Sequence, residues 1–203
     1  MKEPIKIEQI NFPYATNVVS RQQFDEHQKL YAGYIGKMNE INDVLVNNPE
    51  AASANAIYSH YRGLKKGETF ALNGIILHEE YFANLGGRRK GMGETTSGLL
   101  QEFFGSIEAW AADFAATAAS ARGWCITAYD QRQQTIINLL QDSHDDGVIT
   151  MAFPIIVLDM YEHAYFIDYG ANKAEYIKNF IENIDWDVVE GRAAKVAAIF
   201  SKV

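Results

Sequence analysis

The 203-residue sequence contains one cysteine, Cys125, which excludes an internal disulfide framework and a cysteine-rich metal site. It has no apolar run long enough to span a bilayer, and its first residues, Met-Lys-Glu-Pro-Ile-Lys, lack the apolar core of a signal peptide. Positive charge is also scarce: the formal net charge is −8, which argues against non-specific binding of nucleic acid. These absences favour a cytoplasmic protein with no membrane and no nucleic-acid partner.

What the sequence does contain is a globular composition. Apolar residues make up 48% of the chain, enough to build a sizeable core in one domain or in two small, closely packed ones. From residue 20 to about 48, apolar residues recur at three- and four-residue spacing, which predicts a helix capped by Ser20 and ended by Asn47-Asn48-Pro49. A second helix is expected over roughly 69–85, and the two helices would form an antiparallel hairpin.

The second half of the chain has a different pattern. Two helical stretches come first, three strands follow, and two helices close the chain; the expected ranges are 99–104 and 107–119, then 124–129, 135–140 and 151–158, then 174–184 and 188–200. A helical half followed by a small sheet covered by helices is an α+β fold. We therefore expect an N-terminal antiparallel helical hairpin domain (residues 1–88) and a C-terminal domain (residues 89–203) with a three-stranded antiparallel sheet flanked by helices.

A glycine-rich stretch, Gly86-Gly-Arg-Arg-Lys-Gly-Met-Gly93, lies between the two halves. It lacks the Gly-Lys-Ser/Thr ending and the preceding strand of a phosphate-binding loop. We interpret it as a linker.

The most informative stretch is Asp159-Met-Tyr-Glu-His163, which follows the apolar run 153–158. A charged aspartate at the end of a buried strand is costly unless something compensates its charge. A metal ion that also binds His163 would do so. His27 and His78 lie on the two expected hairpin helices, and three imidazoles with one carboxylate are a ligand set that suits iron or manganese.

The sequence resembles the iron/manganese superoxide dismutase family over nearly its whole length. The stretch Asp159-Met-Tyr-Glu-His-Ala-Tyr-Phe-Ile-Asp-Tyr169 is close to the family signature Asp-x-Trp-Glu-His-Ala-Tyr. His78-Glu-Glu-Tyr-Phe is similar to the family's His-x-x-Phe/Tyr-Trp segment, and Tyr34-Ile-Gly-Lys-Met-Asn39 is similar to its first-helix motif Tyr-Val-x-x-Leu-Asn. Together the three segments are a specific match to the motifs of this family.

The resemblance implies an enzyme that cycles one iron or manganese ion per subunit and converts superoxide into oxygen and hydrogen peroxide. It implies that the metal ligands are His27, His78, Asp159 and His163. Tyr34 would stand at the mouth of the substrate funnel. His144 lies in the turn where family members place a Gln or a His close to the metal, so Tyr34 and His144 are the implied catalytic residues.

The resemblance also implies a homodimer joined through the Glu162–His163 region, with Glu162 holding the partner subunit's His163. Lys29 and Lys173 fall where family members carry basic residues that attract superoxide. Ordinary solvated lysines are an equally good interpretation of both positions.

The first ligand is where the sequence departs most from the family. Counting forward from Ser20 places the ligand at His27, whereas counting back from Tyr34 places it at Glu26, because one residue is missing between the two landmarks. A seven-residue separation keeps His27 and Tyr34 on one face of a regular helix, and eight residues would require a π-bulge. Imidazole suits the site better than a second carboxylate, but Glu26 stays open as the alternative.

Other departures surround the expected funnel. The family's His-His pair after the first ligand is replaced by Leu30-Tyr31, and the tyrosine that reaches it across the interface is Phe166. Three tryptophans of the family are replaced, by Tyr161, Phe82 and Ile126. These changes support an alternative: a protein of this fold with lost or altered activity, acting as a non-enzymatic metal-binding or interaction protein.

Overall fold

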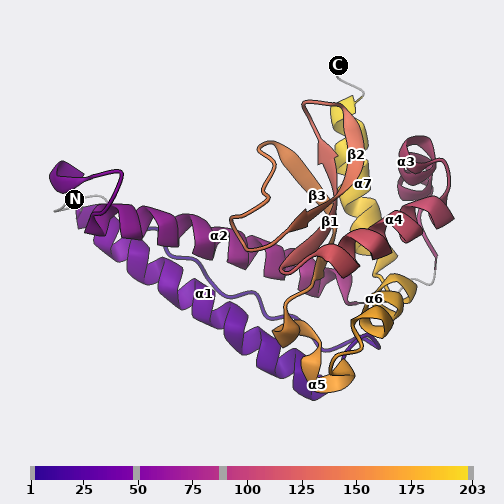
Figure 1. Ribbon diagram of the computed structural model, residues 1–203, viewed down its shortest axis with the longest axis horizontal. Coiled ribbons are helices and arrows are strands. Elements are labelled where there is room, and N and C mark those ends of the chain that lie inside the picture. The colour runs from indigo at the N-terminus through magenta and orange to yellow at the C-terminus, as the bar shows by residue number, and fades with distance from the viewer. Residues whose placement is uncertain (1–2, 48–50, 87–90, 201–203) are drawn as a thin grey trace.

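The computed structural model describes residues 3–47, 51–86 and 91–200. Two long helices, α1 (Arg21–Asn47) and α2 (His60–Asn84), lie side by side and project from the rest of the molecule, with the short helix η1 (Ala51–Ser53) at the far end (Figure 1). The Ser20 hydroxyl accepts a hydrogen bond from the Gln23 amide at 3.1 Å, as the predicted helix cap requires. The predicted end of α1 at residues 48 and 49 lies outside the described residues.

Helix α2 begins at His60, earlier than the predicted start near residue 69. The Ser59 side chain caps it by accepting from the Arg62 amide. Gly67 lies inside this helix and against α1: a Cβ there would be 3.2 Å from Ile41 Cδ1. The glycine therefore permits close packing of the two helices.

The C-terminal half contains a sheet and five α-helices among the described residues. Its elements are α3 (Glu94–Phe104), α4 (Ile107–Ser120), β1 (Trp124–Asp130), β2 (Thr135–Gln141), β3 (Ala152–Asp159), η2 (Glu162–Ala164), α5 (Phe166–Tyr169), α6 (Lys173–Glu182) and α7 (Trp186–Phe200). The strands pair antiparallel in the order β2-β1-β3. The predicted α+β fold class is confirmed.

Two features of this half were not expected. Helix α3 begins at Glu94 rather than near residue 99, because the Glu190 carboxylate on α7 accepts hydrogen bonds from the amides of Thr95 and Thr96, both at 2.9 Å. Such a cap comes from a distant helix and leaves no local pattern. The short helices η2 and α5 were also missed, since three- and four-residue helices carry no periodicity.

The core lies around the central strand β1, all of whose residues are buried. The register pairs Trp124 at the start of β1 with Asp159 at the end of β3. Helix α2 packs along β3, so this end of the sheet meets the helical hairpin (Figure 1). The division at residues 88 and 89 falls among residues that the structure does not describe, and the two-domain organisation stays a prediction. No described helix is long and apolar enough to cross a membrane.

Candidate metal centre

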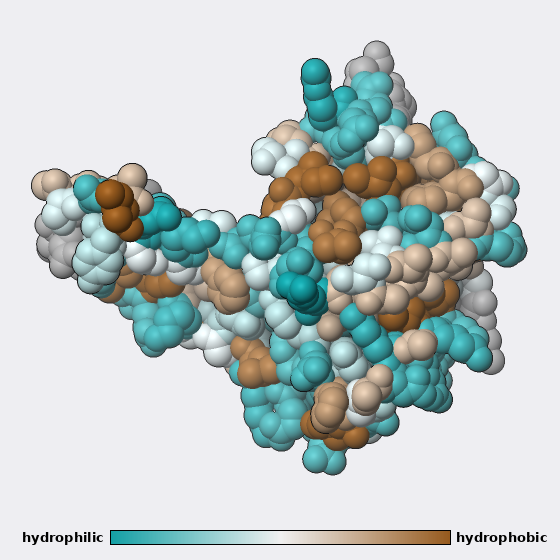
Figure 2. Space-filling view, viewed as in Figure 1, coloured by the Kyte–Doolittle hydropathy of each residue, from teal (hydrophilic) through white to brown (hydrophobic). Residues whose placement is uncertain are grey.

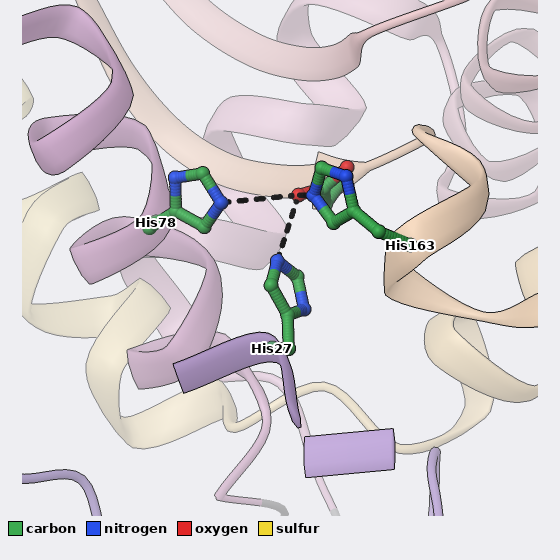
Figure 3. Close-up of side chains that lie close together, drawn as sticks. His27, His78 and His163 are labelled. Carbon is green, nitrogen blue, oxygen red and sulfur yellow. Dashed lines mark ion pairs between the residues drawn. The ribbon is translucent and has the colours of Figure 1, made fainter. Parts of the chain in front are cut away.

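Three imidazoles and one carboxylate converge where the hairpin meets the sheet. His27 comes from α1, His78 from α2, Asp159 from the end of β3 and His163 from η2. One potential ligand atom from each lies within 4.8 Å of the others. In Figure 3 the three labelled imidazoles point toward one carboxylate oxygen, which belongs to Asp159.

All three imidazoles approach the same atom, Asp159 Oδ2. The Nε2 atoms of His27, His163 and His78 lie 3.1, 3.3 and 3.7 Å from it. The Asp159 and His78 side chains are fully buried, His27 nearly so, and the His163 side chain is 28% exposed. The cluster is therefore closed on the hairpin side and open beside His163.

The four converging atoms have no hydrogen-bond partner. They are Nε2 of His27, His78 and His163 and Oδ2 of Asp159. Buried polar atoms are almost always hydrogen-bonded, and each unsatisfied one costs about 1–3 kcal/mol. Four such atoms facing one another are satisfied together by a cation placed among them. The residues present therefore fit a metal ion.

The atoms of these residues that face away from the centre are held in place. Asp159 Oδ1 accepts from the Tyr161 amide at 2.9 Å, which leaves Oδ2 for the centre. His78 Nδ1 lies 2.6 Å from the Gly74 carbonyl. Because a carbonyl only accepts, this nitrogen carries the proton, and Nε2 presents its lone pair to the centre.

The loop that carries His163 is fixed by Gln23 on α1. The Gln23 side chain is 1% exposed. Its Nε2 donates to the His163 carbonyl at 2.5 Å, and its Oε1 accepts from the Ile167 amide at 3.1 Å. Sequence reasoning missed this residue, because a single glutamine on a helix has no distinguishing pattern.

The protonation states suit metal binding. Burial and, second to it, the neighbouring His27 lower the pKa of His78 to about 3; burial also lowers the pKa of His27. Burial by itself would raise the pKa of Asp159, but the contacts with His163 and His27 outweigh it, so the pKa is lowered. Neutral imidazoles and an ionised carboxylate are the forms that bind metal ions.

Glu26, the alternative first ligand, lies outside this cluster. Its side chain is 53% exposed and pairs with Lys29 Nζ at 2.6 Å. Helix α1 is α-helical from Arg21 to Asn47 with no π segment. The seven-residue spacing therefore places His27 and Tyr34 on the same face, and both contact His78, with ring centroids 5.0 and 5.4 Å away.

A hydrogen-bonded chain leads from the sheet to Tyr34. Trp124 Nε1 donates to His144 Nδ1 at 2.9 Å, and His144 Nε2 lies 2.8 Å from the Tyr34 hydroxyl. An indole N–H can only donate, so His144 Nδ1 accepts and Nε2 carries the proton. His144 therefore donates to Tyr34, whose own hydroxyl hydrogen remains available.

His144 and Tyr34, at the end of this series of hydrogen bonds, are a neutral imidazole and a protonated hydroxyl. Burial lowers the pKa of His144 to about 4, so its imidazole is neutral near pH 7. Burial and the charge of Asp159 raise the pKa of Tyr34, so its hydroxyl stays protonated. The turn that carries His144 is tied to α2 by a 2.9 Å ion pair between Asp145 and Lys66.

The two lysines expected near the substrate funnel lie in different surroundings. Lys29 pairs with Glu26 on the exposed surface. Lys173 donates to the Ala121 carbonyl at 2.7 Å and lines a hollow of about 490 Å³ together with Glu162 and His163. Of the two lysines, only Lys173 therefore borders the open side of the metal centre.

The aromatic replacements still pack on the centre. The Tyr161 ring stacks on His163, with centroids 5.1 Å apart and planes 14° apart. The Phe82 ring lies edge-on to His27 at 5.0 Å. Tyr161 and Phe82 therefore cover the imidazoles of His163 and His27.

Gly74 is a residue of this site that sequence reasoning missed. A Cβ at this position would lie 3.1 Å from His144 Cδ2 and 3.4 Å from Tyr34 Cδ1. The only hint in the sequence is a glycine inside an otherwise helical pattern, one turn before His78. Its absent side chain lets the sheet and α1 approach α2 at the metal centre.

We expect Gly74→Ala to crowd His144 and Tyr34 and to lower the rate of the metal centre's reaction by about threefold to tenfold, because small misplacements near reacting groups are costly. The metal content should not change, since the backbone carbonyl that holds His78 is retained. The matched control is Gly63→Ala on the same helix, where a Cβ would meet nothing within 4 Å. That variant should keep full activity and gain up to about 1 kcal/mol of stability; equal activities for the two variants would contradict the assignment.

Comparison with known proteins finds relatives whose names include iron or manganese. Residues 93–192 match the family described as iron/manganese superoxide dismutases, C-terminal domain. Superoxide dismutase [Fe] of Aquifex aeolicus (strain VF5) is 38% identical over 181 residues, which cover 87% of this chain and 85% of the relative. Superoxide dismutase [Fe] of Aquifex pyrophilus is also 38% identical, with the same coverage. Superoxide dismutase [Mn] 2 of Haloferax volcanii is 30% identical over 93% of this chain and 92% of its own length.

These matches extend over the hairpin and the sheet domain together, as the predicted resemblance does. The antiparallel sheet, Asp159 and His163 lie within the residues that match the family, and the three relatives match 87% or more of the chain. The chain belongs to the iron/manganese superoxide dismutase family.

Proposed function

We propose that this protein is a superoxide dismutase that holds one iron or manganese ion per subunit through His27, His78, Asp159 and His163. The observation that carries the proposal is the set of four buried, mutually facing atoms without hydrogen-bond partners. The relatives named superoxide dismutase, some with iron and some with manganese, support the same function. The same names disfavour the alternative of a non-enzymatic member of the family.

When bound, the ion supplies a one-electron redox couple that serves both halves of the dismutation. The chain's own residues set the charge around it. Three neutral imidazoles contribute no charge and Asp159 contributes −1, so a divalent or trivalent cation leaves the centre positive. A positive centre attracts the superoxide anion, although the protein as a whole carries −8.

Peroxide formation also requires two protons, and Tyr34 is placed to deliver one. Its hydroxyl accepts from His144 Nε2 at 2.8 Å, which leaves its own hydrogen free to be donated toward the substrate. Trp124 holds His144 in the tautomer that permits this direction. We assign Tyr34 as the proton donor and His144 as the residue that orients it.

We further propose that two copies form a homodimer through the face that carries Glu162 and that the protein acts in the cytoplasm. Glu162 is exposed, and Leu30, Phe166 and Ile167 are 44, 53 and 50% exposed. Apolar residues exposed on one face are typical of interfaces. In the dimer Glu162 would orient the partner subunit's His163. Sedimentation of the wild type as a dimer and of Glu162→Ala as a monomer would support this; a monomeric wild type would refute it.

The test of the function is a dismutase assay on purified protein loaded with iron or with manganese. We expect rapid dismutation with at least one metal. Tyr34→Phe should keep the metal and the packing of the ring against His144, but it loses the hydroxyl that donates the proton, so activity should fall at least about tenfold. A metal-loaded wild type without activity would refute the proposal and favour the alternative.

A further inference from the structure

The three-stranded sheet has two edge strands, and one of them, β3, is closed to further pairing. The strand order β2-β1-β3 leaves β2 and β3 outermost. The Val157 amide of β3 donates to Asn84 Oδ1 at 2.8 Å. The Ile155 carbonyl of β3 accepts from Arg192 Nη1 at 3.1 Å. This strand also contains Pro154 and a register shift against β1, and such features prevent an edge strand from pairing with another chain.

The other edge strand, β2, has none of these protections. Its sequence, Thr-Ile-Ile-Asn-Leu-Leu-Gln, contains no charged residue and no proline. It pairs with β1 over all seven residues without a register shift. Among the described residues, no side chain is hydrogen-bonded to its main chain. Alternate residues of an antiparallel edge strand point their amides and carbonyls away from the neighbouring strand, so β2 can accept a further strand.

Side chains of β2 are accessible, whereas those of the central strand are not. Every residue of β1 is buried, but Ile137 and Asn138 are partly buried and Leu140 is 37% exposed. Helices α3 and α4 contact β2, and Asn138 donates to Asp113 of α4 at 2.8 Å, so these helices cover part of one face. Figure 2 shows apolar surface over the sheet, where β2 and β3 lie in Figure 1. An exposed leucine on an unpaired edge strand is typical of a contact surface.

Charges of opposite sign flank β2 and select the partner. Arg132, in the turn before β2, and Asp142, directly after it, are both exposed. The seven-residue strand keeps them roughly 24 Å apart within one chain. Two β2 strands paired antiparallel about a two-fold axis would bring Arg132 close to Asp142 of the partner subunit, at both ends of the pair. A parallel pair would place like charges together, so the charges favour a second copy in the antiparallel arrangement.

We propose that β2 pairs antiparallel with β2 of a second copy across a two-fold axis near Ile137, so that two sheets join into one six-stranded sheet. The contact is separate from the face that carries Glu162, and none of the four metal ligands lies on β2. Because a single pair of strands is a small interface, the contact is weak and forms as the protein concentration rises. It joins two of the dimers proposed above into a tetramer.

The experiment is sedimentation equilibrium of the metal-loaded protein from about 1 to about 500 µM. We expect the wild type to change from dimer to tetramer over this range, and Glu162→Ala to change from monomer to dimer. A wild type that changes from monomer to dimer would refute the Glu162 contact and still support the β2 contact. A mass that does not rise with concentration in either protein would overturn the β2 contact.

Leu140→Lys should weaken this association at least about tenfold, because a lysine on an edge strand opposes pairing with another strand. The matched control is Phe153→Lys on β3, where the side chain is 38% exposed. That variant should associate like the wild type. Association that survives Leu140→Lys, or that is lost only in Phe153→Lys, would place the contact elsewhere and overturn the proposal.

A charge exchange tests the antiparallel arrangement. Arg132→Glu should weaken the association about threefold to tenfold, because the new carboxylate would face Asp142 of the partner subunit. Adding Asp142→Arg to the same chain should restore it. Since the two residues are too far apart to pair within one chain, restoration can come only from pairs between copies. A double variant as weak as Arg132→Glu would overturn the antiparallel pairing.

Hydrogen exchange gives a second measurement that needs no variant and decides the matter if Leu140→Lys does not fold. In the wild type, the amides of β2 that point away from β1 should exchange at least about tenfold more slowly at the high concentration than at the low one. The amides of β3 should not change. Exchange in β2 that is independent of concentration, while the mass rises, would overturn the proposal.

Discussion

Replacing Asp159 by alanine should empty the metal centre and lower dismutase activity by more than about 100-fold. Removing residues that only support a metal ligand already costs about 10–100-fold in metal affinity or activity, and Asp159 is the focus of all three imidazoles. Its Oδ2 lies 3.1 to 3.7 Å from their Nε2 atoms. Without the carboxylate, three neutral imidazoles lose the only negative charge at the centre.

The loss should be measured as metal ions per subunit and as activity, each after the same loading procedure. Asp159→Asn separates the loss of charge from the loss of packing, since it keeps the side-chain shape, and it should be similarly inactive. Asp25→Ala is the matched control: Asp25 is 45% exposed and pairs with Arg21 on the surface of α1. Full metal content in Asp159→Ala would show that the ion binds elsewhere.

The metal-free protein should lose several kcal/mol of stability between pH 7 and pH 5. Burial lowers the pKa of His27, of His78 to about 3 and of His144 to about 4. In the unfolded chain these histidines take up protons near their ordinary pKa of 6.5, whereas in the folded state they do not, so stability falls as the pH falls below 6.5. His78 and His144 each account for about 2 kcal/mol over this interval, and His27 acts in the same direction.

Asp159 does not offset this loss. Its pKa is lowered in the folded state, so its stabilising effect is complete above its ordinary pKa near 3.8 and is lost only at lower pH.

Urea unfolding of the chelated protein at pH 7, 6 and 5 measures how the free energy of unfolding changes with pH. His144→Gln, whose amide can replace both ring contacts, should reduce the loss of stability between pH 7 and pH 5 by about 2 kcal/mol. A stability that does not change between pH 7 and pH 5 would contradict the burial of the neutral histidines.

The sequence predicted the fold class and the residues that meet at the centre, because the signature from Asp159 to His163 and the periodicity of the two hairpin helices are local patterns. It left His27 and Glu26 open, since both interpretations depend on whether α1 is regular over one turn. The structure has a regular helix there, which brings His27 inward and leaves Glu26 paired with Lys29 on the surface.

Other features depend on contacts between distant segments and could not be predicted from the sequence. Gly74 matters because His144, from another part of the chain, packs against it. The direction of the hydrogen bond from His144 to Tyr34 depends on the hydrogen bond that Trp124 donates to His144.

The most direct test of the metal centre is the number of iron and manganese ions per subunit in purified wild type, His27→Ala and Glu26→Ala. We predict close to one ion in the wild type and in Glu26→Ala, and a loss of most of the metal in His27→Ala. A wild type without metal, or a His27→Ala variant that keeps its metal while Glu26→Ala loses it, would contradict the four-residue centre.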